Sequence, residues 1–352
     1  MKFKLLCLVI MFIPFSIRGD EICSDLANYI KLVLDKSFLI ESAESDYNKA
    51  EDEYEEAVLK KISAFDIKIM EINKNYLREN IVIIRNSIVL SILEKYFAYL
   101  NTRQELSFAK KDELIKKTEF DRNTKFYENE IISSELKDNS YLQSLTSAEY
   151  RIETENKFNN YRKELFRVVF DDWSNHDFYI HDFADLPEKL RNDYQNDVII
   201  DNYPTIKKLI STIELTEEKY AFYSDSIGIA PYELEKIELE LAELKDMLDS
   251  ERWKIEDSIE LFETQRKLAE LELQRLDVNI NRDYINLDAQ KLLFKQGNVQ
   301  QTTVEAAELN YQKKLYQKKV LDQEIFLYSI KITSLRNMDI YNLLIQNNRQ
   351  TN

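Results

Sequence analysis

Two histidines, each followed by an aspartate, are the residues of this chain whose types suggest metal chemistry. They form the pairs His176-Asp177 and His181-Asp182, and imidazole and carboxylate groups are both ligands of divalent metal ions. No cysteine and no Glu-x-x-His spacing accompanies them, so a solvated or locally hydrogen-bonded loop is the better interpretation. We therefore predict no metal site and no cofactor.

Residue sets typical of enzymes are not recognisable either. The sequence shows no Ser, His and Asp set, and its three glycines leave no glycine-rich phosphate loop. The 64 acidic residues are spread over solvated positions of predicted helices. We expect that the protein is not an enzyme.

Residues 1–19 have the features of a secretory signal peptide. Two lysines precede an apolar run at 5–15, and small residues lie near Gly19. The run is shorter than the roughly 20 residues that span a bilayer. Removal of this leader leaves Cys23 as the only cysteine, so no internal disulfide is possible. Ile22 stands where a lipidation signal normally has a small residue, which argues against a lipid anchor.

The charge of the chain limits its partners. The formal net charge is −16, and it becomes about −19 without the leader, which holds three basic and no acidic residues. Such a surface repels nucleic acids and anionic lipid headgroups, so we expect no nucleic-acid partner. The leader places the protein in the periplasm or the outer membrane.

The scarcity of glycine and proline predicts an all-α protein of elongated antiparallel helical hairpins, a coiled-coil bundle. We expect a short helix from residue 26, a second at 38–66, and a long one from about 75 to 128 that returns at 133–169. A matching series begins at Pro204, reaches about 223, and resumes from 232 to 295. The predicted divisions are a first helical repeat at 20–170, a connector at 171–203, a second repeat at 204–338 and a polar tail at 339–352.

A tight bend is predicted at Gly297, because glycine can take a positive φ where a helix must stop. The side chains of Gln300, Thr302 and Thr303 are expected to cap the helix that follows. When the chain is shifted by 167 positions, Gly297 falls on Glu130 and Val299 on Ile132, with the apolar phase kept along both arms. We predict an internal duplication, with a second bend at Glu130.

The two bends resemble those of the TolC family of outer-membrane efflux channels. The motif is an aromatic residue, a glycine three places on, a hydrophobe and a Ser or Thr, represented here by FKQGNVQ at 294–300 and YENEIISSEL at 127–136. Family members insert two β-strands per copy, but residues 60–75 and 224–232 have no room for pairs of membrane strands. The resemblance therefore implies a TolC-like periplasmic helical domain with little or no β-barrel.

The resemblance also implies partners and a contact site. It implies a homo-oligomer, a trimer in the family, that meets a periplasmic adaptor or an inner-membrane transporter at the tips of the hairpins. The predicted tip residues are Glu130, Ile132, Ser133, Ser134, Gly297, Asn298, Val299, Gln300 and Thr302. The leading hypothesis is a passive helical conduit or strut in a transport assembly. The alternative is a structural coiled-coil protein of the periplasm without transport activity.

Overall fold

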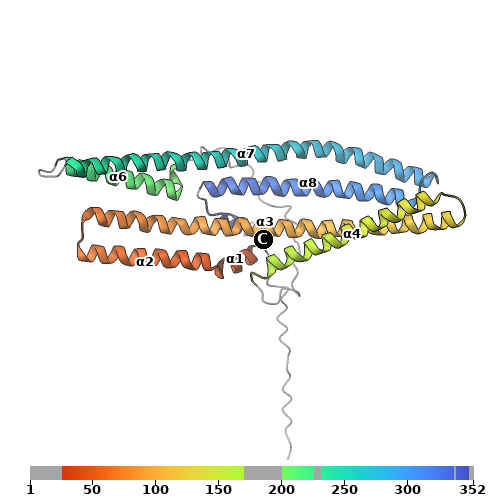
Figure 1. The fold of residues 1–352 in the computed structure, drawn as a ribbon, viewed down its shortest axis with the longest axis horizontal. Helices are drawn as coiled ribbons and strands as arrows, with labels where there is room; N and C mark the ends of the chain where they lie inside the picture. Colours follow the sequence, from red (N-terminus) through yellow and green to blue (C-terminus); the bar gives the residue numbers. More distant parts are fainter. Residues whose placement is uncertain (1–25, 170–199, 226–230, 337, 349–352) are drawn as a thin grey trace, which may run out of the picture.

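The computed structural model describes residues 26–169, 200–225, 231–336 and 338–348, and shows long antiparallel helices side by side (Figure 1). The elements are α1 (Leu26–Asp35), α2 (Phe38–Lys60), α3 (Ala64–Glu128), α4 (Ser134–Phe166), the 3₁₀ turn η5 (Ile200–Asn202), α6 (Pro204–Ser224), α7 (Pro231–Lys295), α8 (Gln301–Leu335) and α9 (Ile340–Asn348). The described residues contain no strand, so the all-α prediction is confirmed. None of the described helices combines the length and apolar character needed to cross a bilayer.

Helix packing follows a repeat of seven residues. The face of α2 toward α3 buries Ala43, Ala50 and Ala57, which are spaced by seven. On α4 the same spacing buries Ser140, Ser147 and Thr154. A seven-residue repeat is the signature of coiled-coil packing, and small side chains in the seam let the two backbones approach closely. The α3 helix has 65 residues, so it is about 97 Å long at 1.5 Å per residue.

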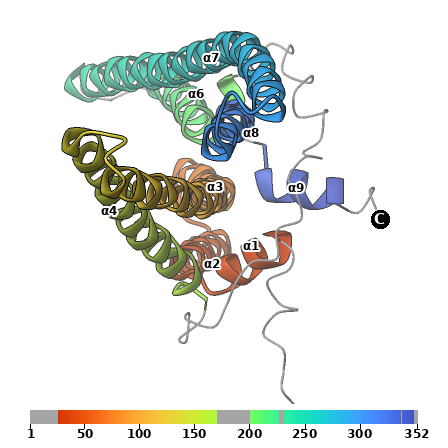
Figure 2. The same cartoon turned by 90° about the vertical axis from the view of Figure 1, so that its right-hand side faces the viewer.

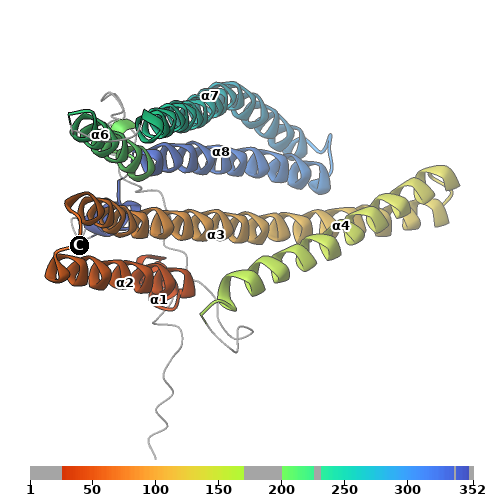
Figure 3. The ribbon, with the colours of Figure 1, turned by 60° about the vertical axis from the view of Figure 1, so that its left-hand side comes forward.

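The helices lie in one curved layer. The long helices α3 and α7 run through both halves of it, and the shorter helices beside them differ between the halves. In the half that holds the bends near Glu130 and Gly297 the order is α4–α3–α8–α7, and in the other half it is α2–α3–α6–α7. Figure 2 shows this order along the rods, and Figure 3 shows α4 and α2 following each other along α3. One edge of the layer is therefore α7, and the other is α4 together with α2.

The largest hydrophobic cluster lies around the middle of α3, where α1, α9 and the ends of α4 and α8 meet. Polar contacts fix these ends. The Tyr29 hydroxyl donates to the Leu165 carbonyl, and Lys36 Nζ donates to the Val169 carbonyl over 2.9 Å. These bonds hold the end of α4 against α1.

The turn between α2 and α3 comes earlier than the sequence indicated. The second helix ends at Lys60, and the long helix begins at Ala64 instead of near residue 75. The backbone of Lys61 takes φ 52° and ψ 46°, and its N–H and that of Ile62 close the turn on carbonyls of α2. Because no glycine marks this left-handed residue, local composition gave no sign of the turn. Residues 64–75, which belong to the first of the two places where family members insert strands, are helical.

The prediction of a polar tail at 339–352 is wrong for its first half. Residues 340–348 form α9, in which Ile340 and Leu344 are buried in the central cluster. Two buried apolar side chains four residues apart give this helix a face that the bundle covers.

Several sequence-based predictions lie outside the described residues. They are the signal peptide at 1–19, the environment of Cys23, and both histidine–aspartate pairs with most of the connector at 171–203. The two repeats at 20–170 and 204–338 stay a prediction. The pairs α3 with α4 and α7 with α8 support it, because they have 65 and 33 residues in the first case and 65 and 35 in the second.

Candidate functional site

The bend at Gly297 has the geometry predicted from the sequence. Its φ is +76°, its N–H donates to the Phe294 carbonyl over 2.9 Å, and the Asn298 N–H donates to the Leu293 carbonyl over 2.9 Å. This pair of hydrogen bonds is the Schellman arrangement, which satisfies the last carbonyls of a helix. The prediction that Gly297 ends the long helix in the left-handed conformation is confirmed.

The bend at Glu130 repeats this geometry without a glycine. Glu130 has φ +58°, its N–H donates to the Tyr127 carbonyl over 2.9 Å, and the Ile131 N–H donates to the Phe126 carbonyl over 2.8 Å. A residue with a Cβ at this φ is strained by about 1–2 kcal/mol. The two bends therefore have the same backbone geometry, but the bend at Glu130 carries a conformational strain that glycine avoids at Gly297.

Exchanging the residue types at the two bends should have opposite effects on stability. We expect Gly297→Ala to lower the free energy of unfolding by about 1 kcal/mol, because no atom lies within 4 Å of an added Cβ and only the positive φ opposes it. Glu130→Gly should raise it by up to about 1 kcal/mol, since relief of strain outweighs the greater freedom of the unfolded chain. Urea denaturation at one protein concentration measures both; changes of the same sign at the two bends would contradict the equivalence.

The caps of the two return helices differ, and one prediction needs correction. Ser133 caps α4, since its Oγ accepts a hydrogen bond from the Leu136 N–H over 3.3 Å. At the other bend the N-cap residue Gln300 makes no side-chain cap hydrogen bond, and Thr302 Oγ1 accepts instead from Arg122. The predicted cap by Gln300 is therefore wrong, and the described contact of Thr302 Oγ1 is with Arg122 of the other hairpin; the described hydrogen bonds include no cap by Thr303 either.

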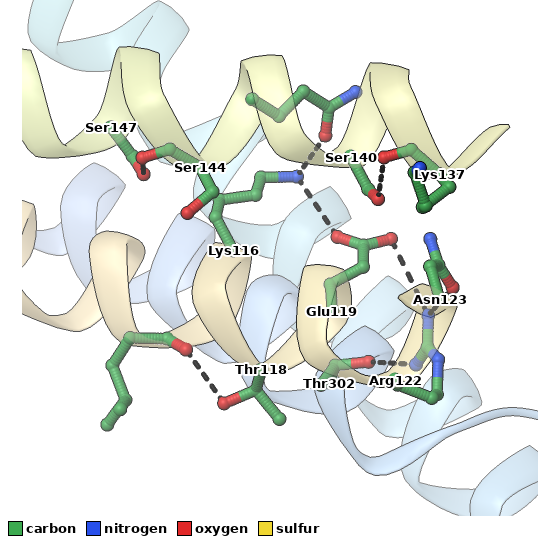
Figure 4. Close-up of polar contacts among 12 residues, drawn as sticks. Lys116, Thr118, Glu119, Arg122, Asn123, Lys137, Ser140, Ser144, Ser147 and Thr302 are labelled. Carbon is green, nitrogen blue, oxygen red and sulfur yellow. Dashed lines mark hydrogen bonds and ion pairs between the residues drawn. The ribbon is translucent and has the colours of Figure 1, made fainter. Parts of the chain in front are cut away.

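Arg122 on α3 connects the two hairpins next to their bends. Its Nη1 donates to Thr302 Oγ1 over 3.1 Å, across 180 residues of chain (Figure 4). Its Nη2 lies 3.8 Å from Glu119 Oε1, so one guanidinium contacts a carboxylate of its own helix and a hydroxyl of α8. Sequence reasoning missed Arg122, because nothing in its local pattern distinguishes it from other helix-surface arginines.

A second set of contacts joins α3 to α4 behind the Glu130 bend. Lys116 Nζ donates to Gln143 Oε1 over 3.0 Å and lies 3.4 Å from Glu119 Oε2 (Figure 4). Glu119 therefore contacts both Lys116 and Arg122. This chain of contacts ties α4, α3 and the start of α8 together within one end of the molecule.

The predicted tip residues lie at the two bends at this same end. Most of their side chains are exposed, and two hydrophobes are half-buried: Ile132, and Val299, which packs against Leu287, Val304 and Ala307. Of the predicted residues, Thr302 is the one that a described hydrogen bond joins to the other hairpin. The structure thus brings the two bends to one end, and their role as a contact site for a partner stays a prediction.

A cavity of about 510 Å³ lies further along the layer, lined by all four helices of this half. Both edge helices contribute to it: Tyr150 comes from α4, and Glu272, Arg275, Leu276 and Asn279 come from α7. Its wall combines charged residues with the rings of Phe108 and Tyr316. Burial, and then the charge of Glu105, raise the pKa of Tyr316, whose hydroxyl donates to Asn101 Oδ1 over 2.6 Å.

Metal ligation finds no support in the described part of the chain. Its residues include no group of three or more His, Cys, Asp or Glu side chains placed to hold a metal ion. Many of the ion pairs there join residues one helical turn apart, such as the exposed pairs Lys60 with Glu56 and Arg275 with Glu272. Pairs of this kind stabilise a helix surface and carry out no chemistry.

Solved structures of outer-membrane proteins share this fold. The outer-membrane protein VceC of Vibrio cholerae aligns over 89% of this chain and 96% of its own, with a TM-score of 0.66 and 10% identity. The open-state outer-membrane channel MtrE of Neisseria gonorrhoeae aligns over 90% of both chains, with a TM-score of 0.61 and 10% identity. The outer-membrane channel OprN aligns over 89% and 90%, with a TM-score of 0.64 and 8% identity.

The likeness rests on the fold. No family model and no curated protein matches the sequence. The TolC-like fold expected from the residues around the two bends is confirmed, over nearly the whole length of the chain.

Proposed function

We propose that this protein is a passive helical component of a transport assembly in the cell envelope. The observation that carries the proposal is the alignment of close to nine-tenths of the chain with outer-membrane channels. In this role the protein performs no reaction. Its long helices extend through the cell envelope and either enclose or support the route along which another molecule is transported. The predicted leader, which takes the chain across the inner membrane, supports a place in the periplasm or at the outer membrane.

Association of several copies belongs to the proposal. A layer of helices with two open edges leaves apolar side chains exposed along α4 and α7, and long hairpins of this kind require lateral partners to cover them. The two edges are different surfaces, so their pairing is head-to-tail and closes into a ring when the rotation permits. A trimer is the size that the resemblance implies.

The end that carries both bends is the proposed contact for an adaptor or an inner-membrane transporter. The bends present exposed, mostly polar groups on short rigid turns, and the Arg122–Thr302 hydrogen bond sets the position of one hairpin against the other. A contact surface built on fixed helix ends loses little entropy on binding. No nucleic-acid partner and no cofactor are part of the proposal.

A conduit and a strut differ in what the concave side of the layer needs. A strut without transport activity, the second candidate, needs no polar lining there. The cavity between the four helices is lined by Glu105, Glu272, Lys313 and Lys314 together with aromatic and aliphatic side chains, and its charged groups suit a water-filled path. This observation favours the conduit.

Deletion of the gene tests the conduit against the strut. We expect the deletion to increase sensitivity to at least one class of toxic compound, and re-expression of the full-length protein to restore resistance. Unchanged sensitivity combined with an altered cell shape would instead favour the strut. Cells that express the protein can also be fractionated. A protein found in the cytoplasmic fraction would contradict both the conduit and the strut.

A further inference from the structure

Residues 309–321 of α8 form a basic segment in an acidic protein. They include no acidic residue and four lysines, Lys313, Lys314, Lys318 and Lys319, whereas the whole chain has a formal net charge of −16. The α8 helix lies between α3 and α7 (Figure 1). Lys318 pairs with Asp277 of α7 over 2.7 Å, so its charge is compensated locally. Lys313 and Lys314 instead line the cavity between the four helices.

The lining of this cavity carries more positive than negative charge. Its basic residues are Lys313, Lys314 and Arg275, and its acidic residues are Glu105 and Glu272. Arg275 and Glu272 form an ion pair of 3.3 Å on α7, so their charges offset each other. Two lysines of α8 then stand against one carboxylate, that of Glu105 on α3. The electrostatic potential within the cavity therefore favours an anion.

Neither lysine is held by an ion pair within the part of the chain that the structure describes. Lys314 Nζ donates to the neutral Oε1 of Gln317 over 3.1 Å. Lys313 makes no hydrogen bond or ion pair with a described residue. Each ammonium group has three donors, so both side chains retain donors for a ligand. A carboxylate or sulfonate that accepts from them forms charge-assisted hydrogen bonds, which are stronger than neutral ones.

The rest of the cavity wall is aliphatic and aromatic. The rings of Phe108 and Tyr316 meet edge to face with their centroids 5.9 Å apart, and Leu276 and Val320 continue this apolar surface. Tyr150 on α4 adds a third ring, which is 47% exposed. An aromatic ligand packs against such rings by offset or edge-to-face contacts. The volume of about 510 Å³ lies in the range of small-molecule sites, about 300–1,000 Å³.

We propose that the cavity binds a small aromatic anion, a ring that bears a carboxylate or sulfonate group. Lys313 and Lys314 hold the anionic group, and the ring packs against Phe108, Tyr150 and Tyr316. The site lies within a single chain, so binding does not require the association of copies. The inference deepens the proposed function, on which it rests only where the bound anion is regarded as the transported compound.

Equilibrium dialysis of the full-length protein, purified after secretion, against naphthalenesulfonate tests the site. We expect one bound molecule per chain, and a dissociation constant that rises by tenfold or more in the variant with Lys313→Gln and Lys314→Gln, because two charge-assisted contacts are lost. Far-UV circular dichroism checks that the variant keeps its helices. Unchanged binding by this folded variant would overturn the assigned site.

The matched control carries Lys110→Gln and Lys117→Gln. It removes the same charge from exposed positions of α3 that do not line the cavity. Its dissociation constant should stay within about twofold at about 0.15 M salt, where exposed charges are largely screened. Equal effects of the two lysine pairs would show that the overall charge, and not the cavity, attracts the anion.

Two further substitutions test the orientation of the ligand. Tyr150→Ala removes an exposed ring and should raise the dissociation constant by about threefold or more, since an aromatic contact is lost. Glu105→Gln should lower it by about twofold or more, because the carboxylate repels the bound anion. Weaker binding after Glu105→Gln would overturn the assignment of an anion, and so would tighter binding of the naphthylmethylammonium cation than of naphthalenesulfonate.

Failure of this site and failure of the proposed function give different results. No bound naphthalenesulfonate at concentrations up to about 1 mM overturns the site, whatever effect deletion of the gene has on sensitivity to toxic compounds. Binding that the lysine variant loses, together with unchanged sensitivity of the deletion strain, supports the site and overturns the conduit.

Discussion

Replacing Phe166 with alanine is expected to lower the free energy of unfolding by about 3–5 kcal/mol. The Phe166 side chain has 0% exposure in the central cluster, and its ring meets that of Tyr99 edge to face with the centroids 6.1 Å apart. Removing the ring loses this contact and leaves a cavity at the place where α4 ends against α1 and α3. The surrounding helices keep their other contacts, so they relax only partly into the cavity.

Urea denaturation followed by circular dichroism measures this effect, at one fixed protein concentration because association also stabilises the fold. Phe38→Ala is the matched control, since Phe38 is 76% exposed and its loss should change the free energy by less than about 0.5 kcal/mol. Equal effects of the two substitutions would show that the central cluster does not hold the described helices together.

Asn86→Ala is expected to release the C-terminal helix α9 from the bundle. Asn86 is fully buried on α3, its Nδ2 donates to the Met338 carbonyl over 2.8 Å, and its Oδ1 accepts from the Ile340 N–H over 3.0 Å. Alanine leaves the buried Ile340 N–H without a partner, at about 1–3 kcal/mol, and removes the partly buried hydrogen bond to the Met338 carbonyl, worth about 1 kcal/mol. The free energy of local opening should therefore fall by about 2–4 kcal/mol.

Hydrogen exchange of the amides at 340–344 reports this opening directly. We expect their exchange to accelerate by tenfold or more, while amides in the middle of α7 stay protected. Arg85→Ala provides the comparison on the same turn of α3, because the Arg85–Asp339 pair at 2.9 Å is partly exposed and should contribute about 1 kcal/mol or less. A larger effect from Arg85 than from Asn86 would place the main attachment of α9 in the ion pair.

Local sequence patterns predicted the elements well where helix length and glycine decide the outcome. The long helix ending at Lys295 and the proline start of α6 follow from uninterrupted helix-forming residues and from a fixed proline φ. The bend at Glu130 was found by comparison with Gly297, although glutamate gives no local sign of a positive φ. The same absence of a local sign hid the Lys61 turn, although the shift of 167 positions places Lys61 on Gly228.

Contacts between distant segments were not predictable in this way. The Arg122–Thr302 hydrogen bond joins residues 180 positions apart, and the docking of α9 on Asn86 joins residues 254 positions apart. Amphipathic periodicity shows that one face of a helix is covered. Several helices of this chain have similar apolar faces, however. Periodicity therefore does not specify which partner covers each face.

The sequence by itself determined that this protein is a set of long helices with two equivalent bends, because helix propensity and the heptad spacing of apolar residues act over a few turns at most. Only the tertiary structure decided the order α4–α3–α8–α7, the bridge between the two hairpins, and which apolar rows remain uncovered. These properties depend on the free energy of packing whole helices side by side, to which each residue contributes a small part. The total packing free energy therefore determines which helices form the two open edges, α7 on one side and α4 with α2 on the other, where we expect a second copy to bind.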